Sequence, residues 1–270
     1  MSARTSLGIV EIARDVHWLP IRGTNVYFVR SGESWVLVDA GFPGSGRIIA
    51  EAAGRLCGAA GRPGSILITH GHPDHVGSAV GLAAAWDVPI LAPAGEMPFI
   101  DGTALYPEPL VAWLARVLPR RAMAALVRDS DLGEAVRPFD PQAGAPGLPD
   151  WVCVPTPGHT PGHVAFFRPG DRTLIAGDAV LTMAWSSRLG GGGAGWLWDL
   201  MRRKPRLSGP PTVFTCDWRD AAASVVALAD LEPWLLATGH GTPFVGRHAA
   251  RALRAFAARC GEADGSDQGA

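Results

Sequence analysis

The sequence has almost no net charge, no cysteine pairs and no long hydrophobic run. Its 270 residues carry a formal net charge of −1, which argues against the basic surface of most nucleic-acid binders. No stretch reaches the roughly 18 uninterrupted apolar residues of a membrane-spanning helix. The N-terminal residues also lack the apolar segment of a secretory signal. We therefore expect a cytoplasmic protein that acts on a small molecule, with no nucleic-acid or membrane partner.

The cysteines do not form a recognisable framework. They are scattered along the chain without a CxxC pair, at Cys57, Cys153, Cys216 and Cys260. Four isolated cysteines in a chain of this length favour free thiols in a reducing compartment over a disulfide scaffold. All four lie away from the turns that carry candidate ligands, so we interpret them as structural.

The hydrophobic pattern predicts an α/β fold. In the first half, strand-like runs at 25–30, 34–40, 65–69 and 88–92 alternate with helical patterns at 47–57 and 76–86. In the second half, strands are expected at 151–156, 163–168, 172–178 and 233–239, with helices at 218–231 and from 246 onward. Strand-rich blocks interleaved with surface helices indicate sheet layers covered by helices. We predict one domain over residues 1–262, followed by a disordered tail at 263–270.

Residues 93–150 differ from this pattern. The segment is rich in proline, holds a helical stretch near 110–127, and is interpreted as a lid-like insertion. Its apolar side chains, together with the tryptophans around a glycine-rich loop at 190–195, are candidates for an apolar substrate wall. These residues are Met97, Phe99, Ile100, Tyr106, Trp113, Trp185, Trp196 and Trp198. The alternatives are that they pack the insertion onto the body, or that they form a homodimer surface.

Three histidines and an aspartate are crowded into ITHGHPDHVG, residues 68–77. His70, His72 and Asp74 alternate directly after a short apolar strand, and His75 follows. Alternate residues of an extended chain point the same way, and a tight turn would bring the last two toward a neighbouring point. Neutral imidazoles and carboxylates are the ligands expected for zinc, and for iron or manganese. The segment therefore predicts a metal site.

Three later positions repeat this pattern. Each follows a short apolar strand and is flanked by glycine, which permits close approach of the backbone to an ion. They are His159 in PTPGHTPGHV, Asp178 in LIAGDAV and His240 in LLATGHGTP. Several strands would thus present ligands along one edge. The remaining histidines, which we interpret as hydrogen-bonded structural residues, are His17, His163 and His248.

Taken together, these motifs resemble the metallo-β-lactamase superfamily. THGHPDHVG, PTPGHTPGHVAFF, LIAGD and TGHG occur in that family's order, and Asp39 at the end of WVLVD matches a further family aspartate. The resemblance covers most of the chain. It implies a four-layer αβ/βα sandwich, here with a helical lid insertion, and a metal site at the open edge between the sheets.

The resemblance also implies roles for individual residues. A first metal would be held by His70, His72 and His159, a second by Asp74, His75 and His240, and both would be bridged by Asp178. Asp39 would accept a hydrogen bond that fixes the orientation of a ligand imidazole. Asp74 and Asp178 would be the catalytic residues, with Asp74 orienting the nucleophile or relaying a proton to the leaving group.

Two divalent cations about 3.5–4 Å apart lower the pKa of a shared water toward 7. The implied reaction is hydrolysis by a metal-bridging hydroxide, with zinc expected and manganese or iron as alternatives. The aspartate at position 178 resembles the residue found at this position in lactonases, thioesterases and phosphodiesterases. Zinc β-lactamases usually carry cysteine or serine there. Glyoxalase II has an extra helical domain after its last ligand, while only residues 241–270 follow here.

The expected substrate is an ester, lactone or thioester with an apolar group. Two alternatives on the same fold stay open. One is phosphodiester hydrolysis, and the other is mononuclear iron chemistry similar to that of persulfide dioxygenases, because metal availability decides which ion occupies such ligands.

Overall fold

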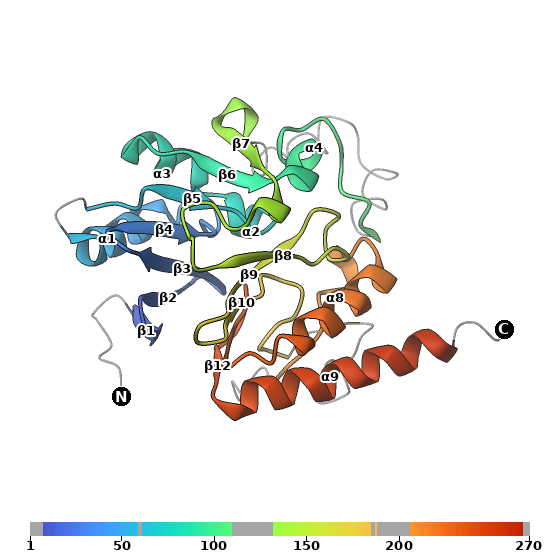
Figure 1. Ribbon diagram of the computed structural model, residues 1–270. Coiled ribbons are helices and arrows are strands. Elements are labelled where there is room, and N and C mark those ends of the chain that lie inside the picture. The colour runs from blue at the N-terminus through green and yellow to red at the C-terminus, as the bar shows by residue number, and fades with distance from the viewer. Residues whose placement is uncertain (1–7, 59–60, 110–131, 185–186, 188–205, 267–270) are drawn as a thin grey trace. The chain divides into compact units, whose positions relative to one another are not determined.

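The computed structural model describes residues 8–58, 61–109, 132–184, 187 and 206–266 (Figure 1). The backbone contacts divide the chain into two units. Unit 1 comprises Met1–Leu105 and Val117–Val152, and unit 2 comprises Tyr106–Arg116 and Cys153–Ala270. Among the described residues, no helix is both long and apolar enough to cross a membrane.

Unit 1 is built on a mixed sheet whose strands follow one another in chain order. The described residues contribute seven strands: β1 (Val10–Ala13), β2 (Val16–Ile21), β3 (Thr24–Ser31), β4 (Ser34–Val38), β5 (Ser65–Leu67), β6 (Ile90–Pro93) and β7 (Val136–Phe139). The strands from β1 to β4 pair antiparallel, and those from β4 to β7 pair parallel. The predicted runs correspond to β3, β4, β5 and β6. The short strands β1, β2 and β7 were not predicted.

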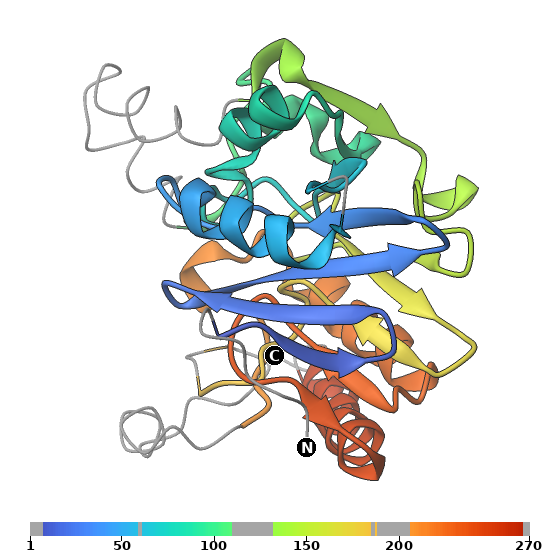
Figure 2. The same ribbon diagram turned by 90° about the vertical axis from the view of Figure 1, so that its left-hand side faces the viewer.

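Helices cover one face of this sheet. The helix α1 (Gly46–Leu56) lies in front of the sheet in Figure 2, and its buried residues Ile49, Ala52 and Ala53 have helical spacing. They belong to the same apolar core as Phe28 and Leu37 of the sheet, and the helix α3 (Ala79–Trp86) adds Leu82 and Trp86. Between them, the short helix α2 (Pro73–Val76) carries part of the histidine motif. The parallel strand β5 thus ends just before His70, and the candidate ligands occupy the turn between β5 and α2 and the start of α2.

Residues 93–150, which we expected to form a lid-like insertion, contribute to the first sheet. Their described elements are η2 (Ala94–Glu96), α4 (Met97–Ile100), η4 (Gly133–Ala135), β7 and η5 (Pro141–Ala143). Because β7 pairs with β6 from Ile90↔Val136 to Pro93↔Phe139, deleting the whole segment would remove a sheet strand. The interpretation of residues 1–262 as one domain with a lid stays a prediction.

Two of the candidate wall residues instead pack into the body. Ile100 is fully buried in the core of unit 1, and Met97 packs against that core. Phe99 and Tyr106 are partly exposed. The other candidates, Trp113, Trp185, Trp196 and Trp198, lie outside the described residues, as do the predicted helix at 110–127 and the loop at 190–195.

Unit 2 contains a second sheet. Its described residues form five strands in the order β12 (Phe244–Val245), β11 (Leu235–Ala237), β10 (Thr173–Ile175), β9 (Val164–Arg168) and β8 (Val152–Pro155). After the short η6 (Thr212–Phe214), the helices α8 (Trp218–Asp230) and α9 (Arg247–Ser266) pack side by side (Figure 1). Their residues Val225, Leu228, Leu253 and Phe256 enter the same core as Leu174 of the sheet. The helix α9 includes residues 263–266, where we expected a disordered tail.

All four cysteines carry free thiols, as predicted, and two lie in the cores. Cys57 packs in unit 1 and Cys260 in unit 2. Burial disfavours the charged thiolate, which raises the pKa of each of these thiols to about 11. Neither residue is therefore suited to nucleophilic catalysis at neutral pH.

We expect Cys57 and Cys260 to resist iodoacetamide in the native protein. At pH 7.5, which is about 3.5 units below the thiol pKa, each thiol is almost entirely protonated. Alkylation should therefore be slower than for an ordinary cysteine by about 100-fold or more. The rate should increase as the pH rises toward the thiol pKa. Peptide mass spectrometry measures this, with the less buried Cys216 as internal reference and unfolded protein as control. Rapid labelling of Cys57 in the native protein at pH 7.5 would contradict its assignment as a buried structural thiol with a raised pKa.

Candidate metal centre

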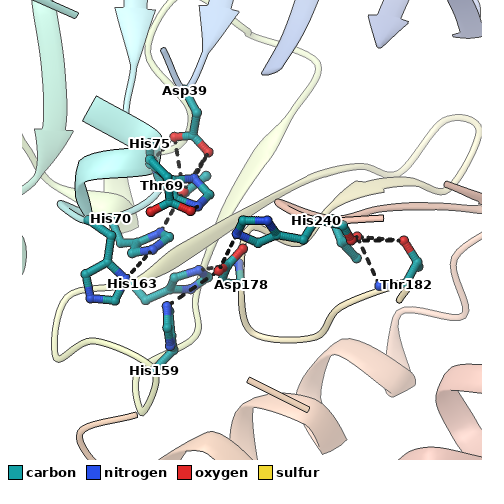
Figure 3. A network of polar contacts seen from close by, with 12 residues as sticks. Asp39, Thr69, His70, His75, His159, His163, Asp178, Thr182 and His240 are labelled. Atoms are coloured by element: carbon teal, nitrogen blue, oxygen red, sulfur yellow. Dashed lines mark hydrogen bonds and ion pairs between the residues drawn. The ribbon is translucent and has the colours of Figure 1, made fainter. Parts of the chain in front are cut away.

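In unit 1, a buried carboxylate fixes the ring of His75. Asp39 lies just after β4 and accepts hydrogen bonds from the Thr69 backbone N–H at 2.9 Å and from the Thr69 hydroxyl. His75 Nδ1 lies 2.8 Å from Asp39 Oδ2 (Figure 3). Because a carboxylate only accepts, Nδ1 must carry the proton, and the lone pair of His75 is on Nε2. The family resemblance implied a contact of this kind between Asp39 and a ligand imidazole; the role of His75 as a ligand stays a prediction.

His70 and His72 direct one nitrogen each toward a common point. The Thr69 hydroxyl donates to Asp39, so it accepts from His70 Nδ1–H at 3.1 Å, which leaves the lone pair of His70 on Nε2. His70 Nε2 lies 3.0 Å from His72 Nδ1, and both rings are buried. Two nitrogens bound to one tetrahedral zinc at about 2.05 Å would lie about 3.3 Å apart. The observed spacing therefore suits two ligands of one cation.

Asp74 lies beside His75 at the start of α2. Its Oδ2 is 3.6 Å from His75 Nε2, and its side chain is 18% exposed while that of His75 is fully buried. Pro73 occupies the first turn of this short helix, where its missing N–H costs no hydrogen bond. The sequence HPDH thus turns the chain so that Asp74 presents an oxygen next to His75 Nε2.

In unit 2, the turn carrying His159 is bound to the start of α8. The Gly158 carbonyl accepts from the backbone N–H groups of Cys216 and Asp217, both at 2.9 Å, and the Pro157 carbonyl accepts from the Ser224 hydroxyl at 2.7 Å. Asp217 caps α8 by accepting from the N–H groups of the next turn at 2.8 and 2.9 Å. The position of His159 therefore depends on the capped end of this helix.

Asp178 lies between the two other candidate ligands of unit 2. Its Oδ2 is 3.7 Å from His159 Nε2 and 3.2 Å from His240 Nε2 (Figure 3). His163 Nε2 accepts the Asp178 backbone N–H at 3.0 Å, so the proton of His163 is on Nδ1, which donates to the Thr156 hydroxyl at 2.7 Å. One carboxylate oxygen is thereby held near two imidazoles, as expected of a shared ligand.

The His240 backbone is held by two threonines. Its carbonyl accepts from the Thr238 hydroxyl at 2.7 Å and from the Thr182 hydroxyl and N–H, each at 3.2 Å. The two hydroxyls also contact one another at 2.8 Å. This local network fixes the turn after β11 from which the His240 ring projects.

Each unit thus brings its own predicted residues together. Unit 1 gathers Asp39, His70, His72, Asp74 and His75, and unit 2 gathers His159, Asp178 and His240. Their assignment as ligands stays a prediction. Of the other histidines, His17 is partly buried, which lowers its pKa, and His248 is exposed. Sequence reasoning missed the residues that hold the ligand turns, namely Thr69, Glu96, Thr156, Thr182 and Thr238.

The chain belongs to the metallo-β-lactamase superfamily, because the family model of that name matches residues 19–240. It is 37% identical over 257 residues to the probable metallo-hydrolase YflN of Bacillus subtilis (strain 168), covering 92% of this chain and 91% of that protein. It is 29% identical over 198 residues to a hydroxyacylglutathione hydrolase of Hyphomonas neptunium (strain ATCC 15444), covering 71% of this chain and 64% of that protein.

A solved structure shows the same fold. The metallo-beta-lactamase family protein TTHA1429 from Thermus thermophilus matches with a TM-score of 0.62 at 20% identity, over 91% of this chain and 80% of that chain. The family, the α/β fold and the class of enzyme predicted from the sequence are confirmed. The protein is a metal-dependent hydrolase of the metallo-β-lactamase fold.

Proposed function

We propose that this hydrolase uses two divalent metal ions to cleave an ester, a lactone or a thioester of a small molecule. The observation that supports it most directly is the position of Asp178. One oxygen of this carboxylate lies within 3.7 Å of the Nε2 atoms of two imidazoles, those of His159 and His240. A carboxylate that lies between two histidines is suited to be a ligand shared by a pair of metals.

The proposal assigns three ligands to each metal, in addition to a shared carboxylate. In this proposal, His159 completes the group of His70 and His72, and His240 completes the group of Asp74 and His75. Asp178 is common to both groups. The nitrogen and oxygen donors suit zinc, which we propose as the metal, and the ring orientations of His70 and His75 are already fixed by Thr69 and Asp39.

When bound, the metal pair supplies a water of lowered pKa and a positive charge for the carbonyl oxygen of the substrate. The chain's own residues do the rest. Asp39 keeps the proton of His75 on Nδ1, away from the site. In this proposal Asp74, the more exposed of the two acidic candidates, holds a proton and passes it to the leaving group. No serine or cysteine nucleophile is required.

The substrate class is supported by the relatives and by the aspartate at 178. Hydroxyacylglutathione hydrolase, by its name, cleaves a thioester of glutathione, and 71% of this chain matches such a protein. That relative extends beyond the match, because only 64% of it is covered. We therefore propose ester, lactone and thioester hydrolysis as the reaction without assigning glutathione as the carrier.

Removing the metals should abolish this activity reversibly. After treatment with a chelator and dialysis, we expect no turnover of a panel of p-nitrophenyl esters, lactones and acyl thioesters. Two equivalents of Zn²⁺ should restore it, and free Zn²⁺ at 100 times its dissociation constant should stabilise the fold by about 2.7 kcal/mol per site. Turnover confined to a phosphodiester such as bis(p-nitrophenyl) phosphate, or activity unaffected by chelation, would contradict the proposal.

A further inference from the structure

A buried glutamate contacts the loop between the two histidines of the HGH motif. Glu96 is the last residue of η2, directly after β6, and it is fully buried. Its Oε2 accepts a hydrogen bond from the Gly71 backbone N–H at 2.9 Å. The strands β5 and β6 are parallel, and the Ile68 N–H donates to the Leu91 carbonyl at 2.9 Å, so the turns that follow both strands meet at one edge of the sheet.

The peptide that Glu96 holds lies between two candidate ligands. Gly71 separates His70 from His72, whose Nε2 and Nδ1 converge to 3.0 Å. A glycine has no side chain to restrain its backbone and samples a wide range of φ and ψ. Rotation of this peptide would swing the two rings apart, so a hydrogen bond to the Gly71 N–H fixes the angle between them.

The charge of Glu96 is also suited to this position. A buried carboxylate is costly unless donors compensate it, and the Gly71 N–H makes a charge-assisted bond to it. If Glu96 is ionised, it adds a negative charge beside the peptide that joins His70 to His72, and an opposite charge nearby favours a bound cation. A neutral acceptor would restrain the loop in the same way but would not add this attraction.

We propose that Glu96 is a positioning residue for metal binding: it orients His70 and His72 through Gly71 and adds charge that favours the cation. This inference rests on the proposed metal site. In this proposal Glu96 acts through the Gly71 peptide and not as a metal ligand.

The test compares metal affinity and stability in Glu96→Ala, Glu96→Gln and the parent protein. Metal-free protein is titrated with Zn²⁺ in competition with a chromophoric chelator, and with Co²⁺ while its visible absorption is recorded. Glu96→Ala should weaken Zn²⁺ binding by about 10- to 100-fold, the usual cost of losing a residue that orients a metal ligand. Glu96→Gln keeps an acceptor oxygen and should lie between Glu96→Ala and the parent. The Co²⁺ spectrum should change most in Glu96→Ala.

Asp140→Ala is the matched control. Asp140 lies in the same unit, and its Oδ1 also accepts from a backbone N–H, that of Gln142, at 2.9 Å. Asp140 is exposed. Among the described residues, no hydrogen bond joins it to a candidate ligand. Its loss should leave the Zn²⁺ affinity and the Co²⁺ spectrum equal to those of the parent.

The outcomes separate the two proposals. A lower unfolding temperature of metal-free Glu96→Ala with unchanged Zn²⁺ affinity would show a purely structural role and overturn the inference about Glu96. If Glu96→Ala does not fold, Glu96→Gln decides, because loss of the charge alone should still weaken binding; parent-like affinity overturns the inference. A parent protein that binds neither Zn²⁺ nor Co²⁺ would refute the proposed function as well.

Discussion

Asp178→Ala is expected to lower kcat/KM by about 10³-fold or more, because it removes a charged group that the proposed site uses twice. The Asp178 carboxylate lies near both His159 and His240, so its loss should reduce the metal content as well as the rate. Metal content measured by mass spectrometry should fall from about two ions per chain toward one or none. The fold should persist, because the backbone N–H of Asp178 still donates to His163.

Asp171→Ala is the control for this experiment. Asp171 precedes β10 in the same unit and pairs with Arg168, with Oδ1 at 2.9 Å from Nε and Oδ2 at 2.6 Å from Nη2. This pair is close to the surface, so its loss should cost about 1 kcal/mol or less and leave turnover unchanged. Parent-like hydrolysis by Asp178→Ala would rule out a shared carboxylate at the centre of the reaction.

The second large effect is expected from Gly158→Ala, next to His159. Gly158 has a φ of +123°, and a Cβ there would lie 2.1 Å from the Ala221 nitrogen and 2.4 Å from its Cα. Both atoms belong to the backbone of α8, so neither can move aside without shifting the helix. Strained backbone and overpacking each cost about 1–3 kcal/mol, so we expect a loss of about 3 kcal/mol or more.

Thermal unfolding measures this loss, which corresponds to a fall in Tm of at least about 6 °C for a protein of this size. Gly170→Ala is the matched control, because it lies in the same unit, has nothing within 4 Å of the added Cβ and has no positive φ. Zn²⁺ affinity should fall with Gly158→Ala, since the substitution displaces the His159 turn. Equal melting temperatures and equal Zn²⁺ affinities for the two variants would contradict the proposed role of this turn.

Much of the fold could be predicted because its central strands are short, apolar and bounded by turns. The runs that became β3, β4, β5 and β6 have this character, as do the ends of strands that carry His159, Asp178 and His240. The edge strands were harder to predict. Pro138 lies inside β7, whose sequence VRPF has no alternating pattern, and its pairing with β6 depends on residues more than 40 positions apart in the chain.

The candidate ligands could be found from sequence because the histidines and aspartates of the site either cluster in one short motif or follow glycine-flanked strands. The residues that orient them could not. Glu96 is 25 positions from Gly71 and belongs to no motif. The role of Thr69 depends on its hydrogen bond to Asp39, which the sequence around Thr69 does not indicate. Hydrogen-bond partners of this kind are set by the parallel pairing of β5 with its neighbours, which a single sequence does not specify.

The residues predicted to form an apolar substrate wall show where sequence reasoning predicted too much. Apolar residues of 93–150 suggested a lid, but Ile100 is part of the core and Met97 packs against it. A hydrophobic side chain has the same appearance in the sequence whether it faces a substrate or the interior of the protein. The packing alternative therefore describes these two residues.

The measurement that tests the two-metal proposal most directly is elemental analysis of the purified protein by inductively coupled plasma mass spectrometry. We expect about two divalent ions per chain, with zinc predominant, and a parallel loss of metal and ester or thioester hydrolysis on chelation. One ion per chain, or a single iron accompanied by oxygen-dependent activity on a sulfur substrate, would contradict the binuclear hydrolase.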